Sequence, residues 1–494
     1  MVEGLLLSSA GGLLGLALAA ILVRTAVHVL PESMPRIDYI AIDATVAAFA
    51  VVVALATGTL CSLVPAFAAL RTNLVESLKG LRMTGTSSHS WLRSALLVSE
   101  IAVALVLLTV CGAFLRSLQK MRAVDPGFRP DHALVARYRL PLNQYATGSS
   151  VTTFNRAVVE RIARQPGVMA VGLTSALPAS GGLAGSGFTL EDEPIDKWKL
   201  TFAYFAIVSG DYFHAMGIPL TAGRYFTEND NSTAPFVVIV NQSMASHCWP
   251  NQEAIGKRFH AGNPKNPLPL MMVVGVVADV KLGSRDEPSK DEWYTPADQP
   301  VSLGISSASG KLTSAAGGYI AVRSALPPEQ MSQTLQGSVA EIDPLLALRD
   351  VRPMRDALSN VEAPRRFNTD LITAFAISAL LLAVIGIYAV IAFSVSLRTQ
   401  EIAIRMALGA QRAGIARLVL ISGARLALGG CVLGVLGSVA AARIVGSLLF
   451  QVSATDPLIY AAAVVIMIVM ALLASAVPAT RAASQDPIVA LRSI

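Results

Sequence analysis

The chain has 494 residues, of which 53% are hydrophobic and only 15% are charged, and its mean hydropathy is positive. This composition is typical of a membrane protein and excludes an ordinary large soluble enzyme. The formal net charge of +6 does not indicate nucleic-acid binding, because aromatic residues make up only 6% of the chain and the basic residues form no run of five or more.

Six apolar stretches are long enough to cross a bilayer core as helices, which takes about 20 residues each. The fifth is rich in glycine and long enough to tilt or to break at its glycines. The predicted spans are residues 5–23, 45–70, 95–115, 371–397, 418–449 and 458–477.

The basic residues of the short loops predict the orientation. They cluster between spans two and three, between spans four and five, and in the C-terminal tail, so these segments and both termini are predicted to be cytoplasmic. Residues 119–367 then lie outside the cytoplasm. A secretory signal peptide is the alternative for the first span, but Glu3 stands where a basic residue is expected, and the segment has a copy elsewhere in the chain.

That copy is part of an internal repeat. Near the start, a glycine-rich apolar stretch, a polar loop and a second span end in VPA at 64–66, followed by a short amphipathic segment. The same order recurs near the end, with VPA at 477–479. Chance similarity between spans rich in Leu, Ala and Gly is the alternative. If the repeat is real, residues 1–80 are the last two helices of a first, incomplete unit, and residues 93–494 are a complete second unit.

Between spans three and four, about 250 residues of ordinary globular composition predict a folded domain. Two parts of it are expected to form a strand, a helix and a second strand, at 134–173 and 319–351. Between them, residues 236–240 and 271–277 are expected to be buried strands. The predicted fold is an α-helical membrane protein with six spans and one large α+β extracytoplasmic domain.

No catalytic or metal-binding constellation is predicted in this domain. Its histidines His214, His247 and His260 lack metal-ligand spacing, and the loop at 304–312 fails the phosphate-loop pattern in glycine spacing and in its last residue. Ser175, Ser180 and Ser186 lie outside any nucleophile elbow. The four cysteines are interpreted as buried or inert thiols.

The charged segment RTQEIAIRMALGAQR (398–412) lies between two apolar spans. On a helical period, Arg398, Glu401 and Arg405 share one stripe with Arg412, and Ile402, Met406 and Gly409 form a neighbouring stripe. An alternating strand is less consistent with the intervening alanines. We therefore predict a surface helix over 398–414, which either anchors to the membrane surface or docks onto a partner protein.

This segment resembles the signature of permeases of the MacB/FtsX class of ABC transporters. Further similarity lies in DPGF (125–128), PGV (166–168), GIPLTAGR (217–224) and DPIVALR (486–492), which look like a duplicated-permease subgroup abundant in acidobacteria. The chain departs from that subgroup in lacking the opening span, exported domain and coupling segment of a first unit.

The resemblance implies a domain order. Residues 1–80 would be the end of the first unit, 81–93 a cytoplasmic linker and 94–118 a transmembrane helix. Residues 119–367 would be a periplasmic core domain of MacB type, followed by a helix at 368–397 and a cytoplasmic coupling helix at 398–414. Two further transmembrane helices at 415–480 and a cytoplasmic tail at 481–494 would complete the chain in the bacterial inner membrane.

The resemblance also implies a function: a non-catalytic permease subunit that couples a separate cytoplasmic ABC ATPase to movement of the exported domain. ATP and Mg would bind to the ATPase, and this chain would hold no cofactor. The expected docking residues are Arg398, Glu401, Ile402, Arg405, Met406 and Gly409. Membrane lipid, a second permease unit or a second copy, and a periplasmic adaptor are further expected partners.

Two other functions compete with this one. The chain could be a membrane-anchored receptor or scaffold whose exported domain binds an envelope partner without ATP coupling. A secondary transporter is disfavoured, because Glu100 is the sole charge noted in the third span and residues 371–394 contain none. The cargo cannot be predicted from the sequence.

Overall fold

A computed structural model describes residues 2–29, 43–70, 87–408 and 410–484, with gaps at 142, 180–183, 194–200, 264–265, 268 and 300–316. The chain divides into two compact units. The helical unit comprises Met1–Leu118 and Ala363–Ile494, and the globular unit comprises Gln119–Glu362. Both boundaries between the units fall inside helices, α4 and α9.

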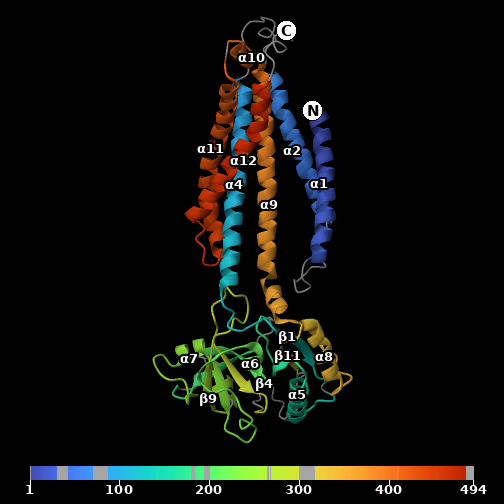
Figure 1. Cartoon of the computed structure of the whole chain (residues 1–494), viewed down its shortest axis with the longest axis vertical. Helices are drawn as coiled ribbons and strands as arrows, with labels where there is room; N and C mark the ends of the chain where they lie inside the picture. Colours follow the sequence, from blue (N-terminus) through green and yellow to red (C-terminus); the bar gives the residue numbers. More distant parts are fainter. Residues whose placement is uncertain are drawn as a thin grey trace. The chain divides into compact units, whose positions relative to one another are not determined.

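The helical unit consists of long apolar helices with one short helix between the fourth and fifth (Figure 1). Five described helices are long and apolar enough to cross a membrane, and part of α2 is a shorter apolar helix. The elements are α1 (Val2–Val29), α2 (Ala44–Leu70), α4 (Ser87–Ala123), α9 (Met354–Leu397), α10 (Thr399–Ala407), α11 (Arg412–Val445), the 3-10 turn η2 (Gly446–Leu448) and α12 (Pro457–Ala483).

All six predicted spans are helices. The two halves of the predicted repeat each contain a pair of helices in contact, α1 with α2 and α11 with α12. Of the two possibilities given for the fifth span, tilting or breaking at its glycines, the break is not observed: α11 runs unbroken from Arg412 to Val445.

The glycines of α11 serve close packing instead. A Cβ atom added at Gly430 would lie 2.4 Å from Cγ2 of Ile101, and one at Gly434 would lie 2.7 Å from Cδ2 of Leu105, both on α4. One helical turn further, the hydroxyls of Ser438 and Thr109 are 2.8 Å apart and buried. Small residues at four-residue spacing let two helix backbones approach closely inside a membrane, which explains why glycine is needed here.

The globular unit is an α+β domain, as predicted. Its strands follow the order β10-β6-β9-β7-β3-β4-β2-β11-β1-β12, with β5 on β9 and β8 on β7. The strands are β1 (Ala133–Arg139), β2 (Val168–Thr174), β3 (Ala184–Leu190), β4 (Thr201–Gly210), β5 (Leu220–Gly223), β6 (Val237–Asn241), β7 (Arg258–Asn263), β8 (Asn266–Pro267), β9 (Met271–Val277), β10 (Glu292–Pro296), β11 (Gly317–Ser324) and β12 (Arg349–Pro353). The helices are α5 (Gly148–Ala163), α6 (Tyr212–Met216), α7 (Gln242–Cys248) and α8 (Pro328–Ala340).

The sheet has two parts. Strand β10 pairs with β6 and also in parallel with β4, so the path from β10 through β6, β9, β7, β3 and β4 closes on itself. The remaining strands β2, β11, β1 and β12 form an open antiparallel sheet. The two predicted strand-helix-strand segments, β1-α5-β2 and β11-α8-β12, both contribute their strands to this open part. Both predictions are confirmed.

Each part of the globular unit has its own core. Phe154 and Val158 of α5 pack with Met331 and Leu335 of α8 against the open sheet. Trp293, Phe259 and Phe188 form an aromatic core among the closed strands. The predicted buried strands are confirmed, since every residue of β6 and nearly every residue of β9 is buried.

Some predicted features lie outside the described residues: parts of the loop at 24–43, the tail of the first repeat and the linker through 71–86, Ser180, the loop at 304–312, Gly409 and the C-terminal tail from 485 onward.

Candidate functional site

The predicted surface helix is α10, and it is shorter than the 398–414 segment expected from the sequence. It begins after Arg398 and ends at Ala407, and the following helix α11 starts at Arg412. Its first turn is closed by the bond from the amide of Ile402 to the carbonyl of Arg398 (2.9 Å). Arg412 therefore belongs to a different helix and does not continue the stripe of Arg398, Glu401 and Arg405.

One face of α10 is anchored in the helical unit. Ile402 is 8% exposed and Ala403 is fully buried, and Met406 packs at the edge of the same apolar cluster. The cluster also contains Ile415 of α11 and Ala482 of α12. This anchoring fixes the position of α10 relative to the ends of the neighbouring helices.

The opposite face of α10 is exposed. It carries the ion pair between Arg405 and Glu401, whose side chains are both about half exposed, together with Ile404 and Leu408, which is 83% exposed. An exposed ion pair four residues apart contributes only about 0.3–0.5 kcal/mol to stability. Its charges and the neighbouring apolar side chains therefore remain available for a partner at little cost to the fold.

Further arginines lie at the start of α11, near the end of α12 and near the start of α4. Arg412 and Arg417 at the start of α11 are exposed, Arg481 of α12 donates a bond to the hydroxyl of Tyr388 on α9 (3.3 Å), and Arg93 of α4 lies 4.4 Å from the ring centroid of Phe393 on α9. A surface with this excess of guanidinium groups attracts acidic partners or anionic lipid headgroups.

The structure thus divides the six residues predicted to dock. Arg398, Glu401 and Arg405 are exposed, and Met406 is half-buried. Ile402 is buried in the helical unit and serves to hold α10 in place, because its apolar side chain is covered by neighbouring helices. Gly409 lies outside the described residues. The pattern missed Leu408, whose exposure could have been suspected from its position one turn after Ile404.

A second polar cluster lies in the globular unit, near the residues where the chain leaves α4 and enters α9. The carboxylate of Glu362 is 6% exposed; its oxygens lie 3.0 Å from Nε of Arg285 and 3.8 Å from Nε of Arg122. Arg285 also donates to the carbonyl of Arg122. We call Arg122, Arg285 and Glu362 the Glu362 cluster. It ties the end of α4 and the start of α9 to one loop, and single-sequence patterns carry no signal for it.

Other titratable groups of the globular unit are structural. Burial raises the pKa of Glu292 to about 8, against the opposing effect of a hydrogen bond from the hydroxyl of Tyr294 (2.7 Å). Because Glu292 is only 4% exposed, an external substrate cannot reach it. Burial likewise raises the pKa of the Cys248 thiol to about 12, which leaves it unreactive. Within the described residues, no group of His, Cys, Asp and Glu could hold a metal ion.

Comparison with protein families matches both units. The family described as the MacB-like periplasmic core domain matches residues 94–339, and the family described as the FtsX-like permease C-terminal matches residues 373–487. Among solved structures, the periplasmic region of MacB from Actinobacillus actinomycetemcomitans aligns with 50% of this chain and 98% of that chain, at 16% identity and a TM-score of 0.32.

Two relatives illustrate the similarity at the sequence level. The pyoverdine export ATP-binding/permease protein PvdT of Pseudomonas aeruginosa is 29% identical over 304 residues, which are 59% of this chain and 42% of that protein. The macrolide export ATP-binding/permease protein MacB 1/2 of Paracoccus denitrificans is 28% identical over 353 residues, which are 69% of this chain and 48% of that protein. The chain therefore spans less than half the length of these relatives. The comparisons do not support the narrower resemblance to an acidobacterial subgroup.

Proposed function

Because the chain is a MacB/FtsX-like ABC permease with a MacB-like periplasmic core domain, we propose that it is the non-catalytic subunit of an efflux or mechanotransmission system. In this proposal a separate cytoplasmic ATPase binds α10 and its ATP-driven motion reaches the periplasmic domain. ATP and Mg are bound by that ATPase.

The observation that carries the proposal is the two-sided character of α10. The face with Ile402 and Ala403 is buried in the helical unit. The face with Glu401, Arg405 and Leu408 is exposed. A push on the exposed face would be passed to α9, α11 and α12, because the anchored face packs in the same cluster as these helices. A helix that was only adsorbed to the membrane surface would not require this packing against other helices.

The Glu362 cluster supports the second half of the proposal. A buried carboxylate held by two arginines is costly to break, so the end of α4 and the start of α9 should move together with the loop that carries Arg285. A motion of these two helix ends would therefore reach that loop of the periplasmic domain.

The names of the two relatives point to export of chemically different compounds, pyoverdine and macrolides. We therefore propose export as the function class and assign no cargo. A second permease unit or a second copy of the chain is a further partner that we propose.

The test is affinity purification of the tagged protein from its native membranes, followed by mass spectrometry, for wild type and Arg405→Glu. We expect an ABC ATPase with wild type and its loss in the variant, because the reversed charge repels Glu401 and changes the basic surface. Arg366→Glu is the matched control, since Arg366 and Asp370 form a similarly exposed pair four residues apart on α9.

An ATPase that is retained equally by wild type and Arg405→Glu would contradict docking through α10. If no ATPase is found in any sample while a protein remains bound to the periplasmic domain, the receptor or scaffold function replaces the proposal. Membrane anchoring as the role of α10 would be indicated if Arg405→Glu and Leu408→Glu reduced membrane insertion instead of partner binding.

A further inference from the structure

Helix α4 carries one carboxylate within its apolar stretch. The candidate span runs over Arg93–Ala123, and Glu100 lies seven residues after Arg93, which is about 10 Å along the helix. An ionisable side chain within a membrane span is costly to keep there, and such residues commonly mark binding sites or transport paths. The presence of Glu100 in this span therefore requires an explanation.

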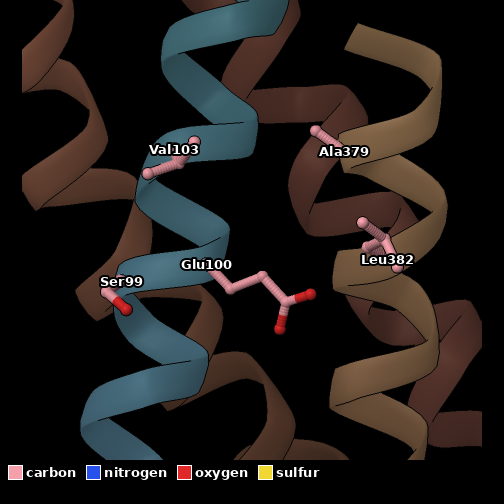
Figure 2. A pocket seen from close by; sticks show the side chains of 5 residues that line it. All are labelled: Ser99, Glu100, Val103, Ala379 and Leu382. Carbon is pink, nitrogen blue, oxygen red and sulfur yellow. The ribbon is translucent and has the colours of Figure 1, made fainter. Parts of the chain in front are cut away.

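Figure 2 shows that the side chain of Glu100 leaves α4 in the direction of α9. It borders a hollow of about 240 Å³, which is lined by Ser99, Glu100, Val103, Ala379 and Leu382. On α9, a Cβ atom at Gly386 would lie only 2.6 Å from Oε2 of Glu100. The glycine therefore leaves room for the carboxylate beside α9.

The described residues provide no counter-charge for this carboxylate. No Lys, Arg or His among them makes an ion pair with Glu100. The arginine on the same helix, Arg93, lies over the ring of Phe393, and Arg481 is bonded to Tyr388. By contrast, Asp456 pairs with Arg116, Asp370 with Arg366 and Glu401 with Arg405.

The walls of the hollow are apolar and open to the surroundings. Val103 is 59% exposed and Leu382 is 58% exposed, and the only other polar side chain, Ser99, donates its hydroxyl to the carbonyl of Leu96 on its own helix (2.7 Å). A ligand for this place must carry a positive charge next to apolar surface.

We propose that the hollow between α4 and α9 binds a lipophilic cation, whose charge lies against Glu100 and whose apolar groups lie against Val103, Ala379 and Leu382. In this proposal the ligand enters from the hydrocarbon region, on the side of the two helices where Val103 and Leu382 are exposed. This binding goes beyond the proposed function: it is an equilibrium property of the helical unit and needs neither ATP nor an ATPase.

The test uses the full chain in phosphatidylcholine nanodiscs and measures equilibrium binding of radiolabelled tetraphenylphosphonium, with binding to empty nanodiscs subtracted. Tetraphenylborate, which has nearly the same size and shape and the opposite charge, is the matched probe. We expect Glu100→Gln, which keeps the size of the side chain, to weaken binding of the cation about tenfold or more. Asp370→Asn removes an exposed carboxylate from α9 and should leave binding unchanged.

A second variant tests the hollow without changing charge. Ala379→Phe places a ring in the space that Ala379 lines and should abolish binding of the cation, while insertion and elution volume stay as in wild type. The proposal is overturned if Glu100→Gln binds tetraphenylphosphonium as tightly as wild type, if Ala379→Phe does so, or if tetraphenylborate binds with the same dependence on Glu100. The last outcome would mean that Glu100 does not act through its charge.

Discussion

The two units of this protein use residues of very different size for their closest internal contacts. Where α11 meets α4, the contact is made by Gly430, Gly434 and Ser438, which bring the two backbones together. In the globular unit, the contact among the closed strands is made by Trp293, Phe259 and Phe205, with ring centroids 5.1–5.9 Å apart.

The solvent of each unit explains the difference. In water, burial of a large aromatic side chain removes much apolar surface from the solvent and drives folding directly. In a membrane, the lipid tails are as apolar as leucine, so association must come from close contact and from a few hydrogen bonds. We therefore expect the most destabilising substitutions to differ: loss of a large side chain in the globular unit, and addition of a side chain in the helical unit.

The largest effect is expected from Trp293→Ala. The side chain is fully buried, stacked on Phe205 and in edge contact with Phe259. Its removal should lower the free energy of unfolding of the globular unit by about 3–5 kcal/mol. Urea titration of the full chain in detergent, with pulse proteolysis of the globular unit, measures this loss.

Trp293→Phe is the matched control for that prediction. The indole Nε1 has no hydrogen-bond partner within the described residues, so phenylalanine keeps ring contacts and removes an unsatisfied buried donor. We expect a loss of less than about 1.5 kcal/mol. If both variants lost the same amount, ring burial would not be the source of stability, and the contrast between the units would fail.

Glu292 should make the stability of the globular unit depend on pH. Burial raises its pKa to about 8 in the folded protein from an ordinary value of 4.5, so the folded state binds more protons than the unfolded state between these values. Stability should therefore fall as pH rises through this window, by up to about 1.4 kcal/mol per pH unit, and level off above pH 8.

The measurement is the urea midpoint at several pH values between 5 and 8.5. Glu292→Gln should flatten this dependence, because glutamine keeps an acceptor for the hydroxyl of Tyr294 and does not titrate. Glu160→Gln, at an exposed position of α5, should leave the slope as in wild type. A wild-type stability that rises across the window would show that Glu292 is not held in its protonated form.

In the helical unit, the most damaging change should be the addition of a side chain. Gly434→Leu would put a Cβ atom 2.7 Å from Leu105 and 3.0 Å from the carbonyl oxygen of Ala102, which forces α11 away from α4. We expect a loss of about 1–3 kcal/mol, measured as thermal unfolding in detergent followed by circular dichroism. Gly414→Leu is the control on the same helix, since nothing lies within 4 Å of a Cβ there, and it should be neutral or slightly stabilising. Equal losses from both would contradict the close contact at Gly434 as the cause, because leucine has the higher helix propensity at either position.

The same contrast explains what could be predicted from the sequence. Apolar length predicted the six long helices described in the helical unit, and alternation with helical periodicity predicted β1-α5-β2 and β11-α8-β12, because these signals are local. The closure of the strand path through β10 and β4 was not predicted, since Trp293 and Phe205 are distant in sequence and only their pairing reveals it. For the same reason the Glu362 cluster was missed.

The glycines of α11 show a different kind of limit. A glycine-rich helix permits either a break or a close contact, and the choice depends on the facing residues Ile101 and Leu105 of another helix. In the surface helix, the heptad spacing suggested that Arg412 continues the stripe of Arg405. Helix α10 ends at Ala407 and α11 begins at Arg412, which interrupts this stripe, and Gly409 is the one helix-stop residue in the sequence between them.

The smallest effect on stability is expected at the buried hydroxyl pair of Thr109 and Ser438. It tests most directly whether close approach or hydrogen bonding holds the helical unit together. Each hydroxyl has a single proton. Thr109 can donate to the carbonyl of Val106 (2.8 Å) and Ser438 to that of Gly434 (2.7 Å) on their own helices, so the contact between them competes with bonds that already satisfy both groups. A double-mutant cycle with Thr109→Val and Ser438→Ala should therefore give a coupling of only about 0.6 kcal/mol. The control cycle pairs Thr109→Val with Ser422→Ala, an exposed serine bonded to its own helix, and should give none. A coupling well above about 1.5 kcal/mol would mean that hydrogen bonding, and not the close approach at Gly430 and Gly434, holds α4 against α11.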